Sequence, residues 1–205
     1  MSTIAYSEMA MRWELLKSEI MYRCRIFSVR RDHSRSLLSG QTSDFHVLET
    51  SDWVNVIPVT RDGEVVMVRQ FRHGIRDLTL EVPAGLMDPA DRSPADAARR
   101  ELREETGYAG DTLVPLGVVH PNPAIMNNRC HVFLARDVER VGAPQWDGTE
   151  ELAIETIPLD RVPTLILDGT VGNALTLVAF HLLGLQDGGD RGVPRARAPL
   201  ALQKS

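Results

Sequence analysis

The chain has 205 residues, of which 43% are hydrophobic and 25% charged, and this composition is typical of a globular protein with one sizeable core. The formal net charge of -5 argues against a protein that binds nucleic acid by neutralising many phosphates. Two cysteines without C-x-x-C spacing, Cys24 and Cys130, argue against a disulfide framework or a zinc site and favour a cytoplasmic location. No apolar run approaches the ~20 residues that span a bilayer, so no membrane association is expected.

The first part of the chain, residues 1–48, is predicted to be a small β appendage. Apolar residues recur loosely among polar ones between Trp13 and His46, which suggests short antiparallel strands. Two apolar strands should follow, at Trp53 to Thr60 and Glu64 to Phe71, joined by a turn that contains Asp62-Gly63. This pattern predicts a β-hairpin at the start of the main domain.

A third strand of that domain, Leu78 to Val82, leads through Pro83-Ala84-Gly85 into a polar loop. A helix over Pro94 to Thr106 should come next, because Ser93 is a suitable N-cap, proline occupies the first helical position and Gly107 stands just past the end. The start and the end of this helix are the best specified of any element in the sequence.

Three further strands are expected after the helix, at Thr112 to His120, Cys130 to Ala135 and Leu152 to Pro158. A second helix over Ala174 to Leu185 has apolar residues at helical spacing, and this pattern indicates core packing rather than chemistry. Residues 49–186 should therefore form one domain. Residues 187–205 lack periodicity and are rich in Gly, Pro and Arg, so a flexible tail is predicted there.

One side of the first helix carries three acidic residues, Glu101, Glu104 and Glu105. Glu101 and Glu105 are four residues apart, which places their Cβ atoms roughly 5–6 Å from each other. Clustered carboxylates are the hard oxygen ligands that Mg²⁺ or Mn²⁺ prefers, so the cluster indicates a metal site. The alternative is a solvated surface patch, since glutamate-rich helices without metals are common.

The segment from Gly85 to Tyr108 resembles the Nudix box, G-x5-E-x7-R-E-U-x-E-E-x-G-U, where U is aliphatic or aromatic. Gly85 opens the motif, and the run from Arg100 to Tyr108 completes it without a mismatch. The sequence departs from the motif twice. Asp91 stands where the loop glutamate is expected, and the interval between Gly85 and Arg100 is one residue longer.

The resemblance implies a role for each residue of the motif. Glu101 and Glu105 would be the principal metal ligands, with Glu104 and the Ala84 carbonyl as further ligands of two to three Mg²⁺ or Mn²⁺ ions. Arg100 would be structural and orient Glu104, and Gly85 and Gly107 would be structural as well. The implied fold is of the α/β (α+β) class, an α/β/α sandwich around a mixed sheet, in a homodimer whose N-terminal appendages help to build the active sites.

Motifs outside the box are similar to the branch that hydrolyses ADP-ribose and nucleoside diphosphate sugars. They are Val68 to Arg72, Glu81 to Gly85, and Pro123. The expected reaction is metal-dependent cleavage of the diphosphate bond of such a small-molecule substrate, which gives a nucleoside monophosphate and a sugar phosphate. Such a reaction needs a hydroxide-like nucleophile and neutralisation of the bridge, and divalent ions supply both.

The remaining site residues are predicted with an alternative beside each. Glu150 is the favoured proton acceptor and Glu151 the second choice, although both fit solvated loop charges equally well. Arg72 could bind a substrate phosphate or be an exposed arginine at a strand end. Glu81 could bind a sugar hydroxyl or support the turn, and Pro123 could line a specificity pocket or stiffen its loop.

Two other classes of function remain open at this point. A ligand-sensing Nudix domain without turnover is one, and the intact glutamates count against it. An enzyme that acts on dinucleotides or capped RNA ends is the other, and the acidic charge balance and the 5% aromatic content disfavour an RNA substrate.

Overall fold

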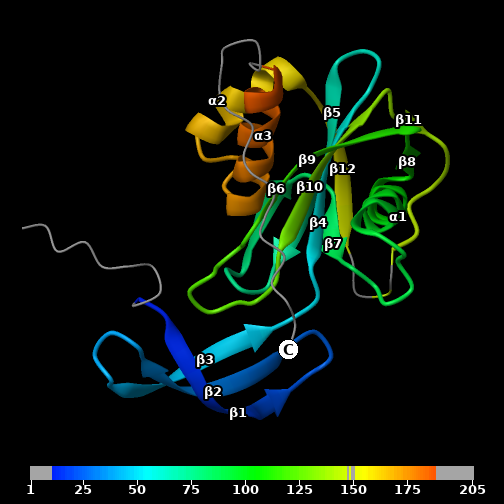
Figure 1. Ribbon diagram of the computed structural model, residues 1–205. Coiled ribbons are helices and arrows are strands. Elements are labelled where there is room, and N and C mark those ends of the chain that lie inside the picture. The colour runs from blue at the N-terminus through cyan, green and yellow to red at the C-terminus, as the bar shows by residue number, and fades with distance from the viewer. Residues whose placement is uncertain (1–10, 147, 149–150, 188–205) are drawn as a thin grey trace, which may run out of the picture.

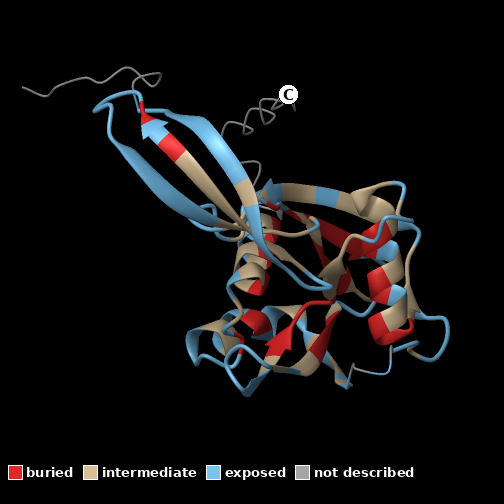
Figure 2. Cartoon of the chain, turned by 90° about the horizontal axis from the view of Figure 1, so that it is seen from below, coloured by how far each residue is buried: buried red, intermediate tan, exposed pale blue. Residues whose placement is uncertain are grey.

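The computed structural model describes residues 11–146, 148 and 151–187. The first described part is a three-stranded antiparallel sheet of β1 (Trp13–Arg23), β2 (Ser28–Ser36) and β3 (Thr42–Glu49), with β2 in the middle. It projects from the rest of the molecule as an arm, and most of its residues are exposed (Figures 1 and 2). This three-stranded sheet, Trp13–Glu49, is called the arm below.

The main body is built on a mixed seven-stranded sheet. Its central path has the order β12-β5-β4-β10-β9, in which β4 and β10 run parallel and the other neighbours are antiparallel. Two shorter strands pair off this path, β6 with β5 and β7 with β4. The bounds are β4 (Trp53–Val59), β5 (Glu64–Arg72), β6 (Asp77–Glu81), β7 (Ala84–Leu86), β9 (Thr112–Val119), β10 (Cys130–Arg136) and β12 (Leu152–Pro158). A small separate ladder joins β8 (Tyr108–Ala109) to β11 (Glu139–Arg140).

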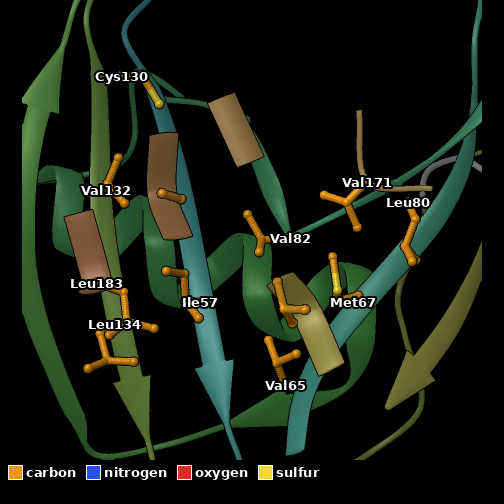
Figure 3. Close-up of a cluster of buried hydrophobic side chains, with 12 residues drawn as sticks. Ile57, Val65, Met67, Leu80, Val82, Cys130, Val132, Leu134, Val171 and Leu183 are labelled. Carbon is orange, nitrogen blue, oxygen red and sulfur yellow. The ribbon is translucent and has the colours of Figure 1, made fainter. Parts of the chain in front are cut away.

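Helices cover both faces of the sheet (Figure 1). Helix α1 (Pro94–Thr106) lies on one face, and α2 (Val162–Leu167) and α3 (Ala174–Asp187) lie on the other, preceded by the 3-10 turn η1 (Leu159–Arg161). Alternate strand residues point to opposite faces, so β4 sends Ile57 to the α3 side and Val54 and Val56 to the α1 side. Figure 3 shows the first of these two buried clusters. The predicted α/β/α sandwich is confirmed.

Strands β4 and β5 diverge along their length. They pair with each other only at Val59 and Val65. Beyond that point the first half of β4 pairs with β7, whereas the second half of β5 pairs with β6. The split leaves a gap within the sheet, edged by the ends of four strands, and the candidate active site lies there.

Most predicted elements match the observed ones to within a residue or two at each end. The short elements β7, β8, β11 and α2 were not predicted, because runs of two to six residues carry too little periodicity to be recognised. Among the described residues, no helix has the length and apolar character that crossing a membrane requires. The tail predicted at residues 187–205 lies almost wholly outside the described residues.

Candidate active site

Helix α1 presents two buried glutamates to the split in the sheet. Its first turn is fixed by Ser93, whose hydroxyl oxygen accepts a hydrogen bond from the Asp96 amide at 3.2 Å. Glu101 and Glu105 leave the helix one turn apart and are only 8% and 4% exposed. The Ala84 amide donates to Glu105 Oε2 at 3.0 Å, so the helix is joined to β7 by one of its carboxylates. A buried carboxylate requires compensation of this kind.

Two glycines allow backbone and carboxylates to approach closely. A Cβ atom on Gly85 would lie 2.2 Å from both the carboxyl carbon and Oε1 of Glu101, so any side chain there would displace the carboxylate. Gly107 ends α1 in the left-handed region with φ of 73°, and a Cβ there would lie 2.4 Å from the Gly142 carbonyl oxygen. Gly107 is therefore required by its backbone, whereas Gly85 is required for the Glu101 carboxylate to keep its position.

Arg100 forms hydrogen bonds both with the segment before α1 and with the glutamates of α1. Its guanidinium donates to both carboxylate oxygens of Asp91 at 3.1 and 2.9 Å and to the Leu86 carbonyl at 3.0 Å. Its Nη1 atom donates to Glu101 at 2.8 Å and to Glu104 at 3.0 Å. The hydrogen bonds from Arg100 lower the pKa of Asp91, and those to Asp91 in turn raise the pKa of Arg100.

This arrangement corrects one expectation from the sequence. Among the described residues, no group of three or more His, Cys, Asp or Glu side chains is placed so that it could hold a metal ion. The three carboxylates have different partners, because Arg100 donates to Glu101 and Glu104 whereas Glu105 accepts from the Ala84 amide. Their chemistry still fits a hard divalent cation, since buried carboxylates beside a backbone turn offer several oxygen ligands at one place.

A second charged pair, between Arg72 and Glu81, stands at the other edge of the split. Nε and Nη2 of Arg72 donate to the two Glu81 oxygens at 2.8 and 2.6 Å, and the hydroxyl of Thr79 donates to Oε1 at 2.5 Å. Glu81 is only 2% exposed. Burial by itself raises the pKa of Glu81, but hydrogen bonds from Arg72 and Thr79 outweigh that effect, so the pKa lies below its usual value.

These groups line one cleft of about 700 Å³. One wall is a loop that is hydrogen-bonded to the end of α1. The Gln145 amide donates to the Glu104 carbonyl at 2.8 Å, and Nε1 of Trp146 donates to the Glu105 carbonyl at 2.9 Å. The lining comprises Arg25, Trp53, Asn55, Gln70, Arg72, Glu81, Ala84, Gly85, Leu86, Arg100, Glu101, Glu104, Glu105, Gln145, Trp146, Asn173 and Leu175. A volume of this size suits a nucleotide-sized ligand.

Comparison with known proteins agrees with this architecture. The family model described as NUDIX domain matches residues 51–177, more than half of the chain. The chain belongs to the Nudix family. The family's enzymes generally use divalent metal ions. The matched range includes Gly85 to Tyr108, so the resemblance of that segment to the Nudix box is confirmed.

Relatives with known activities are found within the family. The ADP-ribose pyrophosphatase of Mycobacterium tuberculosis is 30% identical over 166 residues, which cover 80% of this chain and 80% of that protein. The ADP-ribose pyrophosphatase of Bacillus subtilis is 29% identical over 152 residues, covering 74% and 82% of the two chains. A crystal structure of an ADP compounds hydrolase aligns with a TM-score of 0.79 and 24% identity, over 91% of this chain and 100% of that chain, and shares the Nudix fold.

The structure brings most of the predicted site residues together. Arg72, Glu81, Ala84, Gly85 and the Nudix-box residues of α1 all line the cleft, apart from Gly107, which ends the helix behind it. Pro123 lies in an exposed loop between β9 and β10 and Glu151 is an exposed residue just before β12, and neither is among the lining residues. Glu150 lies outside the described residues. The roles of these three remain predictions.

Several lining residues were not found from the sequence. Trp146 and Asn55 belong to no motif, and Arg25 comes from the arm, far from the Nudix box along the chain. Asn173 had a local signal, because Asn is a favoured N-cap and this one precedes α3. Its side chain accepts from the amides of Leu175 and Thr176 at 2.9 and 3.0 Å.

Proposed function

We propose that the protein hydrolyses the diphosphate bond of ADP-ribose or a related nucleoside diphosphate sugar, releasing a nucleoside monophosphate and a sugar phosphate. The observation that carries the proposal is the pair of buried glutamates, Glu101 and Glu105, held against the Ala84–Gly85 turn at the floor of a nucleotide-sized cleft. The activity of the two ADP-ribose pyrophosphatase relatives supports this choice of substrate.

The proposed cofactor is Mg²⁺ or Mn²⁺, two to three ions per site. Glu101 and Glu105, with Glu104 and the Ala84 carbonyl, would hold them. When bound, divalent ions supply charge neutralisation of the diphosphate and a water of lowered pKa. Because Arg100 Nη1 donates to both Glu101 and Glu104, it holds those two carboxylates next to each other.

The other residues of the chain would bind and orient the substrate and accept a proton. Glu150, with Glu151 as the second choice, is proposed to take the proton of the attacking water, because both stand in the sequence between Trp146, which lines the cleft, and the start of β12. Arg72 and Glu81 are proposed to contact the substrate as a pair, Arg72 a phosphate and Glu81 a sugar hydroxyl. Pro123 is proposed as a specificity residue.

The experiment that tests the function is a product screen. ADP-ribose, GDP-mannose, UDP-glucose, NADH, dinucleoside polyphosphates and capped RNA are each incubated with Mg²⁺ and with Mn²⁺, and the products are identified. Glu105→Gln should lose turnover, whereas Glu139→Gln, an exposed position on β11 outside the cleft, should retain it. Binding without turnover at every metal concentration would instead establish a ligand sensor.

A homodimer joined through the arm is part of the proposal. On one face of the arm, Trp13, Leu15, Ile20 and Phe45 are 46%, 57%, 39% and 42% exposed. The strand register places all four on the same side as the central β2 residues Ser34 and Ser36. Figure 2 shows how little of the arm is covered by the main body. A three-stranded sheet needs a covered apolar face for stability, and a second copy of the chain would provide one.

Light scattering and sedimentation test the dimer. Leu15→Glu puts a charge on the apolar face and should convert the dimer to a monomer. Thr42→Glu puts the same charge beside Arg35 on the opposite face of the arm and should leave the dimer intact. A monomeric wild-type protein would contradict this part of the proposal.

A cytoplasmic location, predicted from the cysteines, is also proposed. Both cysteines are free among the described residues.

A further inference from the structure

Arg25 reaches the catalytic cleft from outside the Nudix domain. It lies in the turn between β1 and β2 of the arm, yet it lines the same cleft as the glutamates of α1. In Figure 1 this turn lies below β4 and β7, on the side of the body where the strands split. The arm therefore contributes a cation to the cleft of its own chain.

The turn that carries Arg25 is closed by a bond of its own and is bonded to Thr50, which lies between the arm and β4. The Cys24 amide donates to the Phe27 carbonyl at 3.0 Å and closes the turn, and the Thr50 hydroxyl donates to the Ile26 carbonyl at 2.9 Å. Ile26 and Phe27 face Trp53 across a small cavity between the arm and β4. The backbone on which Arg25 stands is thus held in place, although its side chain is exposed.

Arg25 differs from the other two arginines of the cleft in having no acidic partner among the described residues. Arg72 donates two hydrogen bonds to Glu81, and Arg100 is shared among Asp91, Glu101 and Glu104. Arg25 forms no salt bridge with any described residue. It is therefore the one arginine of the described lining whose donors are all available to a ligand.

We propose that Arg25 binds a phosphate group of the substrate diphosphate. This inference rests on the proposed function. The described lining holds four glutamates and three arginines, so without added cations it repels a diphosphate. Metal ions would offset part of this charge beside α1. A planar guanidinium with free donors matches a phosphate in a bidentate manner and adds orientation to charge. Arg25 thereby makes substrate affinity depend on the arm.

The test compares Arg25→Gln, Arg25→Lys and the control Arg23→Gln. Arg23 is an exposed arginine at the end of β1, and it is not among the residues that line the cleft. Two quantities are measured for each variant: the Kd of the non-hydrolysable α,β-methylene analogue of ADP-ribose in the presence of Mg²⁺, and kcat and KM for the best substrate of the screen. Light scattering checks that each variant keeps the oligomeric state of the wild type.

Arg25→Gln should raise both Kd and KM by about 10- to 100-fold, the range expected for loss of hydrogen bonds to a charged group, with kcat nearly unchanged. Arg25→Lys should recover part of the affinity, and Arg23→Gln should match the wild type. An active wild type whose Kd and KM are unaffected by Arg25→Gln overturns the inference alone. A wild type that binds the analogue through Arg25 but turns over no substrate overturns only the proposed function. Absence of both binding and turnover overturns both.

Discussion

Replacing Gly85 with alanine tests whether the close approach of β7 to α1 holds Glu101 in its working position. The added Cβ would lie 2.2 Å from the Glu101 carboxyl carbon, whereas ordinary contact begins at 3.4 Å, so the carboxylate must move by the difference, 3.4 − 2.2 = 1.2 Å. A misplacement of about 1 Å in a catalytic group can cost about 10²-fold in rate. We therefore expect kcat/KM to fall about 10²-fold, which corresponds to about 2.7 kcal/mol of transition-state stabilisation.

The effect on stability should be much smaller than the effect on activity. The displaced atoms are the far end of a flexible side chain, so moving them costs about 0.5–1.5 kcal/mol of rotamer strain. The assay is kcat/KM across an Mg²⁺ titration, together with the free energy of unfolding in urea. Gly184→Ala is the matched control, because no atom lies within 4 Å of its added Cβ and alanine favours the helix there. A Gly85→Ala variant with wild-type kcat/KM would refute the reasoning.

Three further predictions concern the buried charges and thiols. Arg72→Gln should lower the free energy of unfolding at pH 7 by about 3 kcal/mol, because it leaves Glu81 buried without its partner. The difference in stability between wild type and variant should shrink toward pH 4, because the unpaired Glu81 of the variant takes up a proton there. In the wild type, the pair's contribution is lost only as the pH falls below about 4.3 and through the lowered pKa of Glu81. Urea unfolding at both pH values checks the sign. Asp91→Asn should cost about 1–3 kcal/mol through weaker bonds to Arg100, and an unchanged unfolding midpoint would contradict this. Burial raises the pKa of Cys130 to about 12, so at pH 8 a thiol reagent should modify only the exposed Cys24 in the native protein and both cysteines in guanidinium.

Helix α1 and its glutamates could be predicted from the sequence because their determinants are local. Ser93, Pro94 and Gly107 specify the ends of the helix within a few residues of chain, and the 3.6-residue period then places Glu101 and Glu105 on one side. Nothing local specifies where a long side chain turns. The position of the Arg100 guanidinium was therefore not predicted, since it depends on its bonds to Asp91 and to the Leu86 carbonyl.

In the one-residue-longer loop of the Nudix box, the sequence shows which residues differ from the motif, and the structure shows how they are bonded. The sequence shows that Asp91 replaces the glutamate of the motif and that the interval to Arg100 is longer, and these looked like two separate departures. In the structure the Asp91 carboxylate accepts two hydrogen bonds from the Arg100 guanidinium and a third from the Asp88 amide, the last at 2.8 Å. The shorter carboxylate therefore still pairs with the arginine in this longer loop.

The family, the alternating strands, the carboxylates suited to a metal and the helix that carries them can all be recognised from the residues alone, because each follows from a short motif, repeat or capping pattern. Which charged side chains are already paired, and which remain available to a ligand, depends on the three-dimensional arrangement of the elements. The register of β5 and β6 puts Arg72 and Glu81 on the same face of the sheet, where the two side chains bond. Arg25 lines the cleft from a turn of the arm that is bonded to Thr50. Contacts between residues distant along the chain depend on how strands and turns are placed in space, and no local pattern encodes that placement.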